Sequence, residues 1–523
     1  MVTSKTATLK SINPANLEVL GEVPVMLEDE VRRTVEKARL AQEDWQLLDF
    51  GKRAALVLKL RRLISRQSKE IAELISNEVG KPIGEAFSAE INGTLDTCVW
   101  LTDNAERLLK DQMIAMTNPM LSSKQSVIAF EPLGVIGIIS PWNYPFSIPM
   151  MAALMSVMVG NTVVLKPSEK SSLIGIKIGD LFKEAGFPEG VMSVVTGDRE
   201  TGRYLSESGL ARVIFTGSVE GGRKVMEQAA ASITPVSLEL GGKDAAIVLP
   251  SAPVKWTAQG IAWGAFTNAG QACASIERLF ILKSKKTDQF LNELLAVTRN
   301  LKVGPASDPT VDIGPVIDQA QLDKIVSHVQ QAREAGATIL TGGSRIEDMG
   351  GYFFQPTIIT DVNPSMAVMQ EETFGPVLPV MVVESEDDVV DLVNNCQYGL
   401  TASIWGKNLK RAENIARDLD VGTVFINDCL FSHAAPQLPW GGIKKSGFGR
   451  THSHFGLLDL VNIKHISIDA AGGATRLWWY PYGPARTKTI EGGIQLFHGS
   501  FPFGKLSGMC KFVGNILRNP KKP

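Results

Sequence analysis

Two kinds of hydrophobic pattern divide the chain. From about Glu28 to Lys110, apolar residues recur at three- and four-residue spacing, for example at Leu60, Leu63 and Ile64. Residues with this spacing share one face of a helix, so the segment predicts several packed helices.

From Val135 onward, short apolar runs alternate with helical stretches. The first five runs are VIGIIS, NTVVLKPS, VMSVVTG, ARVIFTG and AAIVLP. Such alternation is typical of a doubly wound parallel sheet. A second alternating region begins near Gly260 and runs to about Trp440, and it predicts another α/β domain. Ligands of parallel sheets bind beyond the carboxyl ends of the strands, so we expect the functional site in the cleft between the two domains.

Composition narrows the class of protein only slightly. The chain has 523 residues, 44% hydrophobic and 21% charged, which is typical of a soluble protein with two or more domains. Its formal charge of -2 gives no overall attraction to nucleic acid. The five cysteines show no CxxC spacing, which argues against a metal site and a disulfide framework. We find no signal-like start and no long apolar run, which favours a cytoplasmic protein.

Cys273 is the first candidate for chemistry. A free cysteine is more often an inert buried thiol than a nucleophile. Here it lies in FTNAGQACASIER, where Gly270, Gln271 and the flanking alanines favour a tight loop with an accessible sulfur. A nucleophilic cysteine also needs backbone N–H groups or a nearby cation to lower the pKa of its thiol.

Asn143 and Glu239 can complete a site around this sulfur. Asn143, on the turn after VIGIIS, offers an N–H donor for an oxyanion, although it can also be a simple turn former. Glu239 ends PVSLELGG, where Gly241 and Gly242 let the backbone turn sharply. A carboxyl group in a partly apolar cleft has a raised pKa and can take a proton from water, as hydrolysis of an acyl-cysteine requires. Its alternative role is structural.

Two further segments follow predicted strands. Lys166 and Glu169 in VVLKPSE lie where a nucleotide ribose would cross the strand ends, and their alternative is solvated loop charge. Gly217 and Ser218 in FTGSVEGG open a helix, whose N–H groups suit a pyrophosphate. A lone Gly-Ser turn is weak evidence, and the sequence has no GxGxxG fingerprint.

Seven motifs together resemble the NAD(P)-dependent aldehyde dehydrogenase superfamily. In the order of the family they are PWNYP, VVLKPSE, FTGS, LELGGKD, the GQAC loop, EETFGP and PWGGIKKSGFGR. The resemblance covers residues from about 12 to 470, and its overall character is loosely similar to diapolycopene-dialdehyde and fatty aldehyde dehydrogenase-like members. It implies an α/β fold of two doubly wound parallel-sheet domains with a small β oligomerisation arm.

The resemblance also implies domain limits. They are an NAD-binding domain at residues 1–121 and 139–241, a catalytic domain at 242–450, an oligomerisation arm at 122–138 and 455–470, and a basic aromatic tail at 471–523.

By the same resemblance, Cys273 is the nucleophile that carries a thiohemiacetal and then a thioester. Asn143 shares the oxyanion hole with the main-chain N–H of Cys273, and Glu239 is the general base for deacylation. Coenzyme A-dependent relatives generally lack this glutamate, so we expect water to release the carboxylic acid.

The cofactor-binding residues carry over motif by motif. The resemblance assigns the adenosine ribose to Lys166 and Glu169, the pyrophosphate region to Trp142 and Ser218, and the nicotinamide ribose to Glu372 and Phe374. Gly217, beside Ser218, is a cofactor-binding candidate from its position before the helix. Because Glu169 would repel a 2'-phosphate, we expect NAD, while Lys166 keeps NADP open as a second cofactor. The nicotinamide ring would supply the positive charge that the thiol needs.

The substrate is expected to be an apolar aldehyde. Succinate-semialdehyde dehydrogenases typically carry arginines where this chain has Met151 and Thr267, which disfavours a second carboxylate. Met150, Met151, Met155 and Thr267 would line the substrate tunnel, where thioethers suit medium or long-chain, aromatic or isoprenoid aldehydes.

Several alternatives stay open. The methionines can belong to ordinary helix core. The enzyme can act on succinate semialdehyde, betaine aldehyde or another small metabolite. A different class of protein, a catalytically silent structural or binding member of the family, is disfavoured by the presence of all three chemical residues.

The residues after Ala470 differ in composition from the rest of the chain. They contain eight Arg or Lys residues and a single acid, Glu491, so this tail carries +7 against -9 on the body. Its aromatic residues beside Arg476 and Arg486 suit peripheral contact with a membrane, or alternatively docking onto a neighbouring subunit. The arm implies a homodimer or homotetramer.

Overall fold

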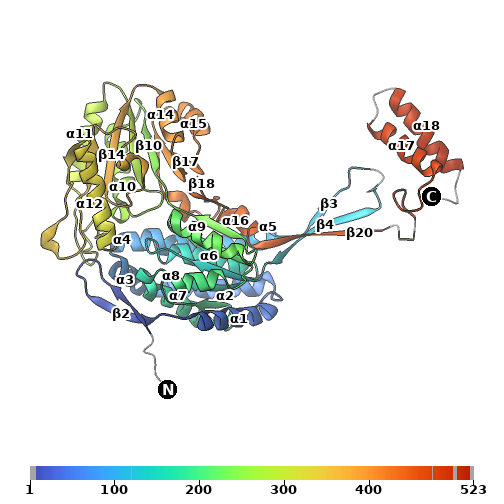
Figure 1. Cartoon of the computed structure of the whole chain (residues 1–523), viewed down its shortest axis with the longest axis horizontal. Coiled ribbons are helices and arrows are strands. Elements are labelled where there is room, and N and C mark those ends of the chain that lie inside the picture. The colour runs from blue at the N-terminus through green and yellow to red at the C-terminus, as the bar shows by residue number, and fades with distance from the viewer. Residues whose placement is uncertain (1–6, 119–120, 471, 474, 499–502, 519–523) are drawn as a thin grey trace, which may run out of the picture. The chain divides into compact units, whose positions relative to one another are not determined.

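The computed structural model describes residues 7–118, 121–470, 472–473, 475–498 and 503–518 (Figure 1). The chain divides into two units. The first comprises Met1–Lys110 and Phe130–Ile463, and the second comprises Asp111–Ala129 and Lys464–Pro523. Each is described by itself.

The first unit begins with an antiparallel pair of strands and a group of helices. The strands are β1 (Thr8–Ile12) and β2 (Val19–Pro24). The helices are α1 (Glu28–Trp45), α2 (Phe50–Arg66), α3 (Ser68–Val79), α4 (Ile83–Glu85), the π-helix η1 (Ala86–Asn92) and α5 (Gly93–Leu108). Leu60, Leu63 and Ile64 are buried in the core, as their spacing predicts. The expected helical segment is therefore confirmed.

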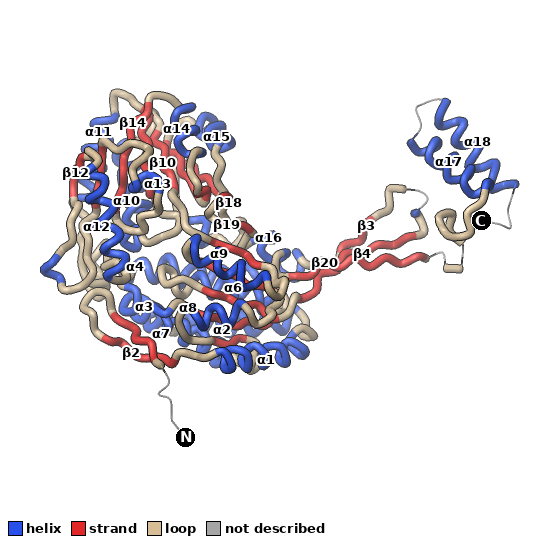
Figure 2. The backbone as a smooth tube through the Cα atoms, viewed as in Figure 1, coloured by secondary structure: helices blue, strands red, loops and turns tan. Residues whose placement is uncertain are grey.

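A six-stranded sheet follows, with strand order β19-β9-β8-β5-β6-β7. In Figure 2, where strands are red and helices blue, the strands of the first unit lie among its helices. Its strands are β5 (Val135–Ile139), β6 (Thr162–Lys166), β7 (Met192–Val194), β8 (Arg212–Thr216), β9 (Val236–Glu239) and β19 (Gly447–Phe448). All pairs are parallel except β9 with β19. The chain runs outward from β5 in one direction through β6 and β7, and then in the other through β8 and β9. This reversal places a ligand crevice at the carboxyl ends of β5 and β8.

Helices connect these strands. They are α6 (Ser147–Met158), η3 (Glu169–Ser171), α7 (Ser172–Glu184), α8 (Arg199–Ser206) and α9 (Val219–Ala230). Ser218 begins α9, and its Oγ accepts a hydrogen bond from the backbone N–H of Gly221 at 3.1 Å. Serine is a favoured residue at this position because it satisfies one unpaired N–H of the first turn.

A seven-stranded sheet has the order β12-β13-β14-β11-β10-β16-β17 and is parallel except for β12 with β13. Its strands are β10 (Asp244–Val248), β11 (Ile276–Leu282), β12 (Thr338–Thr341), β13 (Thr357–Thr360), β14 (Val377–Val383), β16 (Thr401–Trp405) and β17 (Thr423–Ile426). Its helices are α10 (Val254–Phe266), η4 (Thr267–Gly270), α11 (Thr287–Arg299), α12 (Gln319–Glu334), η5 (Glu347–Met349), α13 (Ala367–Gln370), α14 (Glu386–Asn394) and α15 (Leu409–Asp418).

Shorter elements complete the first unit. They are β15 (Tyr398–Gly399), η6 (Phe431–Ala434), β18 (Ile443–Lys444) and α16 (Ser453–Leu458). The two-domain α/β class is confirmed.

Two segments lie elsewhere than the hydrophobic pattern or the expected domain limits place them. The run AAIVLP, grouped with the first sheet, forms β10 of the second sheet, and residues 447–448, assigned to the second domain, join the first sheet as β19. Local hydrophobicity predicts a strand but not its sheet, because pairing partners are distant in sequence.

The strands of the arm also differ from the expected ranges, 122–138 and 455–470. It is a three-stranded sheet of order β20-β4-β3, formed by β3 (Gln112–Ile114), β4 (Lys124–Pro132) and β20 (Val461–Asp469). Val135–Ile139 instead forms β5 of the six-stranded sheet, and helix α16 extends to Leu458.

The tail of the second unit forms two helices, α17 (Pro484–His498) and α18 (Phe503–Arg518). They pack through glycines: a Cβ on Gly492 would lie 2.7 Å from the backbone N of Phe512, and one on Gly508 would overlap the backbone of Leu496. The two helix axes therefore approach closely, and the rings of Phe497 and Phe512 also meet across the pair with their centroids 6.2 Å apart. Among the described residues, we find no helix with the length and apolarity that crossing a bilayer requires.

Candidate active site

The loop before β11 holds Cys273 in a defined backbone conformation. Asn268 and Ala269 have left-handed φ angles of 50° and 55°. The buried Nδ2 of Asn268 donates hydrogen bonds to the carbonyl oxygens of Asn143 at 3.1 Å and Gln271 at 3.0 Å. These bonds tie the cysteine loop to the turn after β5, so the two segments form one rigid structure.

Buried acids anchor the same loops from the helical layer. Glu85 accepts hydrogen bonds from Thr267 Oγ1 at 2.9 Å and from the N–H of Asn268 at 2.8 Å. Burial raises the pKa of Glu85 to about 7. Glu90, in the π-helix η1, accepts two N–H groups at the start of α6 and pairs with Lys81 at 2.5 Å. A π-helical turn is a frequent feature of functional sites, and here it directs a carboxylate at the helix that follows Asn143.

Three cavities meet at Cys273, and each is named here after one lining residue. The Trp142 cavity is also lined by Asn143, Gly217, Ser218, Glu239, Glu372 and Phe374. The Trp263 cavity is also lined by Tyr144, Thr267, Leu430, Phe431, His433 and Trp440. The Met155 cavity is also lined by Met151, Ile214, Glu239, His433, Arg450 and His452. Cys273 lines all three and is partly exposed, whereas Cys98, Cys396 and Cys429 are buried. The alternative of an inert buried thiol therefore does not fit Cys273.

Asn143 does more than form a turn. Its side chain is 4% exposed and donates from Nδ2 to the carbonyl oxygen of Gln271, two residues before Cys273, at 3.1 Å. A side-chain amide has two N–H donors, so a second hydrogen remains for an oxygen atom beside the sulfur.

Glu239 lies at the carboxyl end of β9 and is 7% exposed. Its Oε2 has no hydrogen-bond partner among the described residues, and it lines both the Trp142 and the Met155 cavities. Burial raises the pKa of Glu239 well above its usual value, and the charge of Arg450 and a hydrogen bond from Trp440 oppose that rise. A carboxyl group with one unpartnered oxygen and a raised pKa is suited to proton transfer.

The thiol of Cys273 has a raised pKa, contrary to the need for a thiolate. Burial is the main cause, and the carboxyl groups of Asp244, Glu239 and Glu372 add to it, while a backbone hydrogen bond at Ala274 lowers the pKa. The described residues around Cys273 therefore do not by themselves ionise the sulfur. A cation bound in the Trp142 cavity would favour the thiolate.

Two glycines after Glu239 allow Glu372 and the Cys273 loop to approach closely. A Cβ on Gly241 would lie 2.6 Å from Glu372 Oε2, and a Cβ on Gly242 would lie 2.6 Å from the carbonyl oxygen of Cys273. The N–H of Gly242 also donates to Glu372 Oε1 at 3.0 Å. Any larger residue at either position would displace Glu372 or the cysteine loop.

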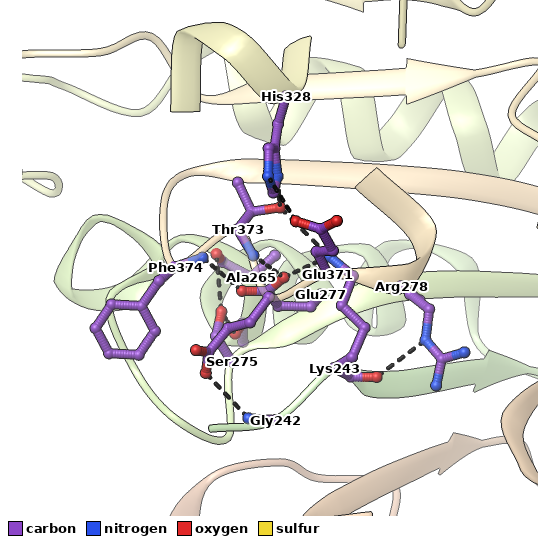
Figure 3. A network of polar contacts seen from close by, with 12 residues as sticks. Gly242, Lys243, Ala265, Ser275, Glu277, Arg278, His328, Glu371, Thr373 and Phe374 are labelled. Atoms are coloured by element: carbon purple, nitrogen blue, oxygen red, sulfur yellow. Dashed lines mark hydrogen bonds and ion pairs between the residues drawn. The ribbon is translucent and has the colours of Figure 1, made fainter. Parts of the chain in front are cut away.

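A buried network positions the EETFGP segment (Figure 3). Glu277 accepts the N–H groups of Thr373 at 2.8 Å and Phe374 at 2.7 Å, and Lys243 pairs with Glu277 at 2.5 Å. Phe374 has a positive φ of 56°, and its ring meets that of Trp142 edge-on at 5.6 Å. The network therefore holds two predicted cofactor-binding residues, Glu372 and Phe374, at the rim of the Trp142 cavity.

Lys166 is the last residue of β6, and Glu169 lies beside it in the following turn. Lys166 Nζ is 3.6 Å from Glu169 Oε2, with the lysine side chain 5% and the glutamate side chain 46% exposed. Burial lowers the pKa of Lys166, and Glu169 counteracts this effect. Lys166 is therefore not a solvated loop charge, whereas Glu169 is accessible to a ligand at the strand end.

The predicted tunnel residues separate into three places. Met151 and Met155 line the Met155 cavity, and Thr267 lines the Trp263 cavity. Met150 is fully buried and belongs to the hydrophobic core around α2 and α5, because consecutive residues of a helix point in different directions. Met150 was predicted to line the substrate tunnel, but it packs in the core and lines none of the three cavities.

Other residues of the site were missed from the sequence. They are Tyr144, Trp263, Phe431, His433, Trp440 and His452 on the cavity walls, and Lys243 and Glu277 in the supporting network. Glu277 lies four residues after Cys273 in a strand-like run. A charged residue in such an apolar run could have indicated a buried polar network. Within the described part of the chain, we find no cluster of His, Cys, Asp and Glu that could hold a metal ion.

Comparison with known proteins identifies the family. The model of the aldehyde dehydrogenase family matches residues 1–466. Betaine aldehyde dehydrogenase from the chloroplast of Amaranthus hypochondriacus is 35% identical over 476 residues, covering 90% of this chain and 94% of that protein. The 4,4'-diapolycopene aldehyde oxidase of Methylomonas sp is 35% identical over 496 residues, covering 94% of this chain and 92% of that protein.

Solved structures agree. A crystal structure of betaine aldehyde dehydrogenase from Staphylococcus aureus in complex with NAD+ has a TM-score of 0.85 and 32% identity, and it covers 91% of this chain and 94% of its own. The chain belongs to the aldehyde dehydrogenase family, whose members oxidise aldehydes. The expected fold and enzyme class are thus confirmed, and the expected NAD agrees with this neighbour.

Proposed function

We propose that this chain oxidises an uncharged, largely apolar aldehyde to the carboxylic acid with NAD, through a thioester on Cys273 that water hydrolyses. The observation that carries the proposal is the position of Cys273, where the three cavities meet beside Asn143 and Glu239. One cavity can admit the cofactor and another the substrate, and the sulfur is accessible from both.

The Trp142 cavity fits the nicotinamide cofactor. Gly217 and Ser218 precede the first turn of α9, whose N–H groups suit a pyrophosphate, and Trp142 and Phe374 form an aromatic wall. Glu372 lies beside them, where it can accept hydrogen bonds from ribose hydroxyl groups. When bound, NAD supplies the hydride acceptor and a positively charged ring near Cys273.

The remaining chemistry belongs to the chain. The Cys273 thiolate attacks the aldehyde carbon, and the oxyanion accepts hydrogen bonds from Asn143 Nδ2 and the N–H of Cys273. Loss of hydride leaves a thioester. Glu239 then takes a proton from water, the hydroxide oxygen adds to the thioester carbon, and the acid leaves as the sulfur regains its electron pair.

The walls of the site support an apolar substrate. The Trp263 cavity has Tyr144, Trp263, Leu430, Phe431 and Trp440 on its sides, and no aspartate or glutamate is among its described lining residues. An apolar chain would be bound there through surface burial.

Chain length is the measurement that tests this substrate class. We expect kcat/KM to rise from butanal to decanal, by up to about fourfold for each methylene that becomes buried. Succinate semialdehyde and betaine aldehyde should both be poorer substrates than decanal. A flat response to chain length, with betaine aldehyde preferred, would contradict the proposal.

A trimethylammonium aldehyde is a second candidate, because relatives are named betaine aldehyde dehydrogenases and aromatic walls can bind quaternary ammonium groups. One observation disfavours it: Lys81 Nζ lies 3.6 Å from the centroid of the Tyr144 ring and already occupies a face of that ring. Succinate semialdehyde would need a free cation. Arg212 and Arg450 line the Met155 cavity, but Arg212 pairs with Asp459 and Arg450 donates to the carbonyl oxygens of Gly442 and Gly449.

Cofactor preference depends on Glu169. Because its carboxylate would repel a 2'-phosphate, we expect Glu169→Gln to reduce the preference for NAD over NADP by about tenfold. The measurement is the ratio of kcat/KM for the two cofactors, with the exposed Glu184→Gln as matched control. A wild-type enzyme that prefers NADP would contradict the assignment.

We also propose that the tail binds the surface of an anionic membrane. Exposed apolar side chains gather on it: Trp479, Tyr480, Ile494, Leu506, Met509 and Val513. Basic residues accompany them, among them Lys488 and Lys505. Helices of 15 and 16 residues are about 24 Å long, shorter than the roughly 30 Å of a bilayer core, which favours an interfacial position.

Point variants can test the tail in the full-length chain. We expect Leu506→Glu with Met509→Glu to abolish sedimentation with phosphatidylcholine–phosphatidylserine vesicles, because charged residues oppose insertion of the apolar face. Thr487→Glu with Ser507→Glu adds the same charge at exposed polar positions and should retain partial binding. Equal sedimentation of the wild type and both variants would contradict interfacial binding.

Two further proposals concern assembly and location. The exposed Ile463, Ile466 and Ile468 of β20, which lies at one edge of the arm sheet, support a homodimer or homotetramer formed through that strand. All five cysteines are free, which supports a reducing, cytoplasmic location.

A further inference from the structure

Two histidines lie side by side on the wall of the substrate space. His433, on η6, lines both the Trp263 and the Met155 cavities, and His452, just before α16, lines the Met155 cavity. Their ring centroids are 5.2 Å apart. The same two cavities contain Cys273, so a molecule held at the sulfur lies in the space that these rings border.

Neither imidazole is satisfied within the protein. Both ring nitrogens of His433 and Nδ1 of His452 are buried without a hydrogen-bond partner among the described residues. The whole of His452 is only 3% exposed. Burial lowers the pKa of His433 to about 4 and that of His452 well below its usual value, so both rings are neutral near pH 7. A neutral imidazole offers one donor and one acceptor.

The backbone at His452 is strained as well. Its φ of 62° and ψ of 172° lie in a region that residues other than glycine rarely adopt. Such conformations persist where the surrounding structure enforces them, and they are concentrated at ligand sites. Here the strain accompanies a side chain on the cavity wall.

Each charged group of the Met155 cavity has a partner or another task, although Arg212 Nε is buried without a hydrogen-bond partner among the described residues. Arg212 donates to Ser237 Oγ at 2.8 Å and pairs with Asp459, and Arg450 is bonded to backbone carbonyl oxygens. Glu239 is the proposed base. The two imidazoles therefore contribute buried, uncharged and unpartnered nitrogen atoms to a wall that also includes Thr216, Thr451 and many apolar side chains.

We infer that His433 and His452 form a subsite for an uncharged oxygen, a hydroxyl or a second carbonyl, carried by an otherwise apolar aldehyde. This inference rests on the proposed function and makes it more specific. The preferred substrate is then bifunctional, with one aldehyde at Cys273 and one oxygen at the histidine pair. The two neutral imidazoles can form hydrogen bonds with any polar atom, but they have no net charge that would attract a carboxylate or an ammonium group.

Three matched series of substrates test the subsite: n-alkanals, ω-hydroxyalkanals and α,ω-dialdehydes from six to ten carbons. At the chain length that spans from Cys273 to the pair, we expect kcat/KM for one or both oxygenated series to exceed that for the alkanal by about tenfold or more, because only these substrates satisfy the buried nitrogens. The series with the larger ratio identifies the oxygen as a hydroxyl or a carbonyl.

Variants connect this ratio to the histidines. His433→Phe and His452→Leu should each bring the ratio of oxygenated substrate to alkanal close to one, and His433→Gln, which keeps a donor and an acceptor, should retain much of it. The control is His454→Leu, a histidine of the same segment that is not among the residues lining these cavities, and it should leave the ratio unchanged. The strained backbone at His452 means that His452→Leu can fail to fold. In that case the two His433 variants provide the test of the subsite.

The outcomes separate this inference from the proposed function. Turnover of alkanals without preference for any oxygenated series, or a preference that survives in His433→Phe, would overturn the subsite alone. Turnover of none of the three series would overturn the proposed substrate class and the subsite together.

Discussion

Cys273→Ala is expected to reduce aldehyde-dependent NADH formation by at least about a thousandfold, because no thiohemiacetal or thioester can form without the sulfur. Binding of NAD should persist, since the Trp142 cavity is formed mainly by residues from other loops. NADH absorbance measures the first quantity, and calorimetric titration with NAD measures the second.

Cys396→Ala provides the matched control for this variant. Cys396 is also free, is 6% exposed and is not among the residues that line the three cavities. Its variant should retain turnover. Substantial turnover in Cys273→Ala would assign the chemistry to another nucleophile, and loss of NAD binding would show that the substitution had disturbed the fold.

Glu239→Gln is expected to separate the two halves of the reaction. Acylation and hydride transfer precede the step that needs this base, so the variant should give a burst of up to one NADH per active site. The steady-state rate after the burst should fall by about a hundredfold to ten-thousandfold. Rapid mixing with an aldehyde resolves the burst from the slow phase.

The pH dependence follows from the raised pKa of Glu239. Only the carboxylate can accept a proton, so deacylation should increase as pH rises through this raised pKa and should be lost as pH falls below it. Glu239→Gln should lack this limb of the profile, whereas Glu70→Gln on the surface of α3 should keep it. An identical profile in Glu239→Gln would exclude Glu239 as the base.

The same carboxyl group affects stability with the opposite sign. Its pKa is higher in the folded than in the unfolded chain, so folding favours the protonated form and the free energy of unfolding decreases as pH rises above the unfolded value. Glu239→Gln removes this cost. Thermal unfolding of the variant should therefore occur at the same or a higher temperature at alkaline pH.

Sequence patterns predicted the elements of the fold better than their connections. The runs at Val135–Ile139 and Thr162–Lys166 form adjacent parallel strands, as their flanking turns and apolar content indicate. The strand at Asp244–Val248 has the same local character but pairs with β11 and β16 of the other sheet. Local composition cannot distinguish these cases, because the choice depends on partners that arrive later in the chain.

The site shows the same division. Cys273, Asn143 and Glu239 each lie in a recognisable motif, in the loop before β11, after β5 and at the end of β9, respectively, and all three line the Trp142 cavity. His433 and His452 lie outside the seven family motifs, and their proposed role depends on burial and on unpartnered nitrogen atoms. Met150 and Met151 are neighbours in sequence, yet one is core and the other lines a cavity. The orientation of α6 about its own axis determines which of the two methionines faces the core and which faces the cavity.

The glycine pair at positions 241 and 242 has a consequence for how this enzyme can diverge. Because neither glycine can gain a side chain without displacing Glu372 or the cysteine loop, the proposed catalytic centre tolerates little variation at these two positions. Trp263, Phe431 and His433 line the Trp263 cavity and are not among the atoms that a side chain at position 241 or 242 would displace. New substrate ranges can therefore arise by exchanging these outer walls, one residue at a time, while the chemistry is inherited unchanged.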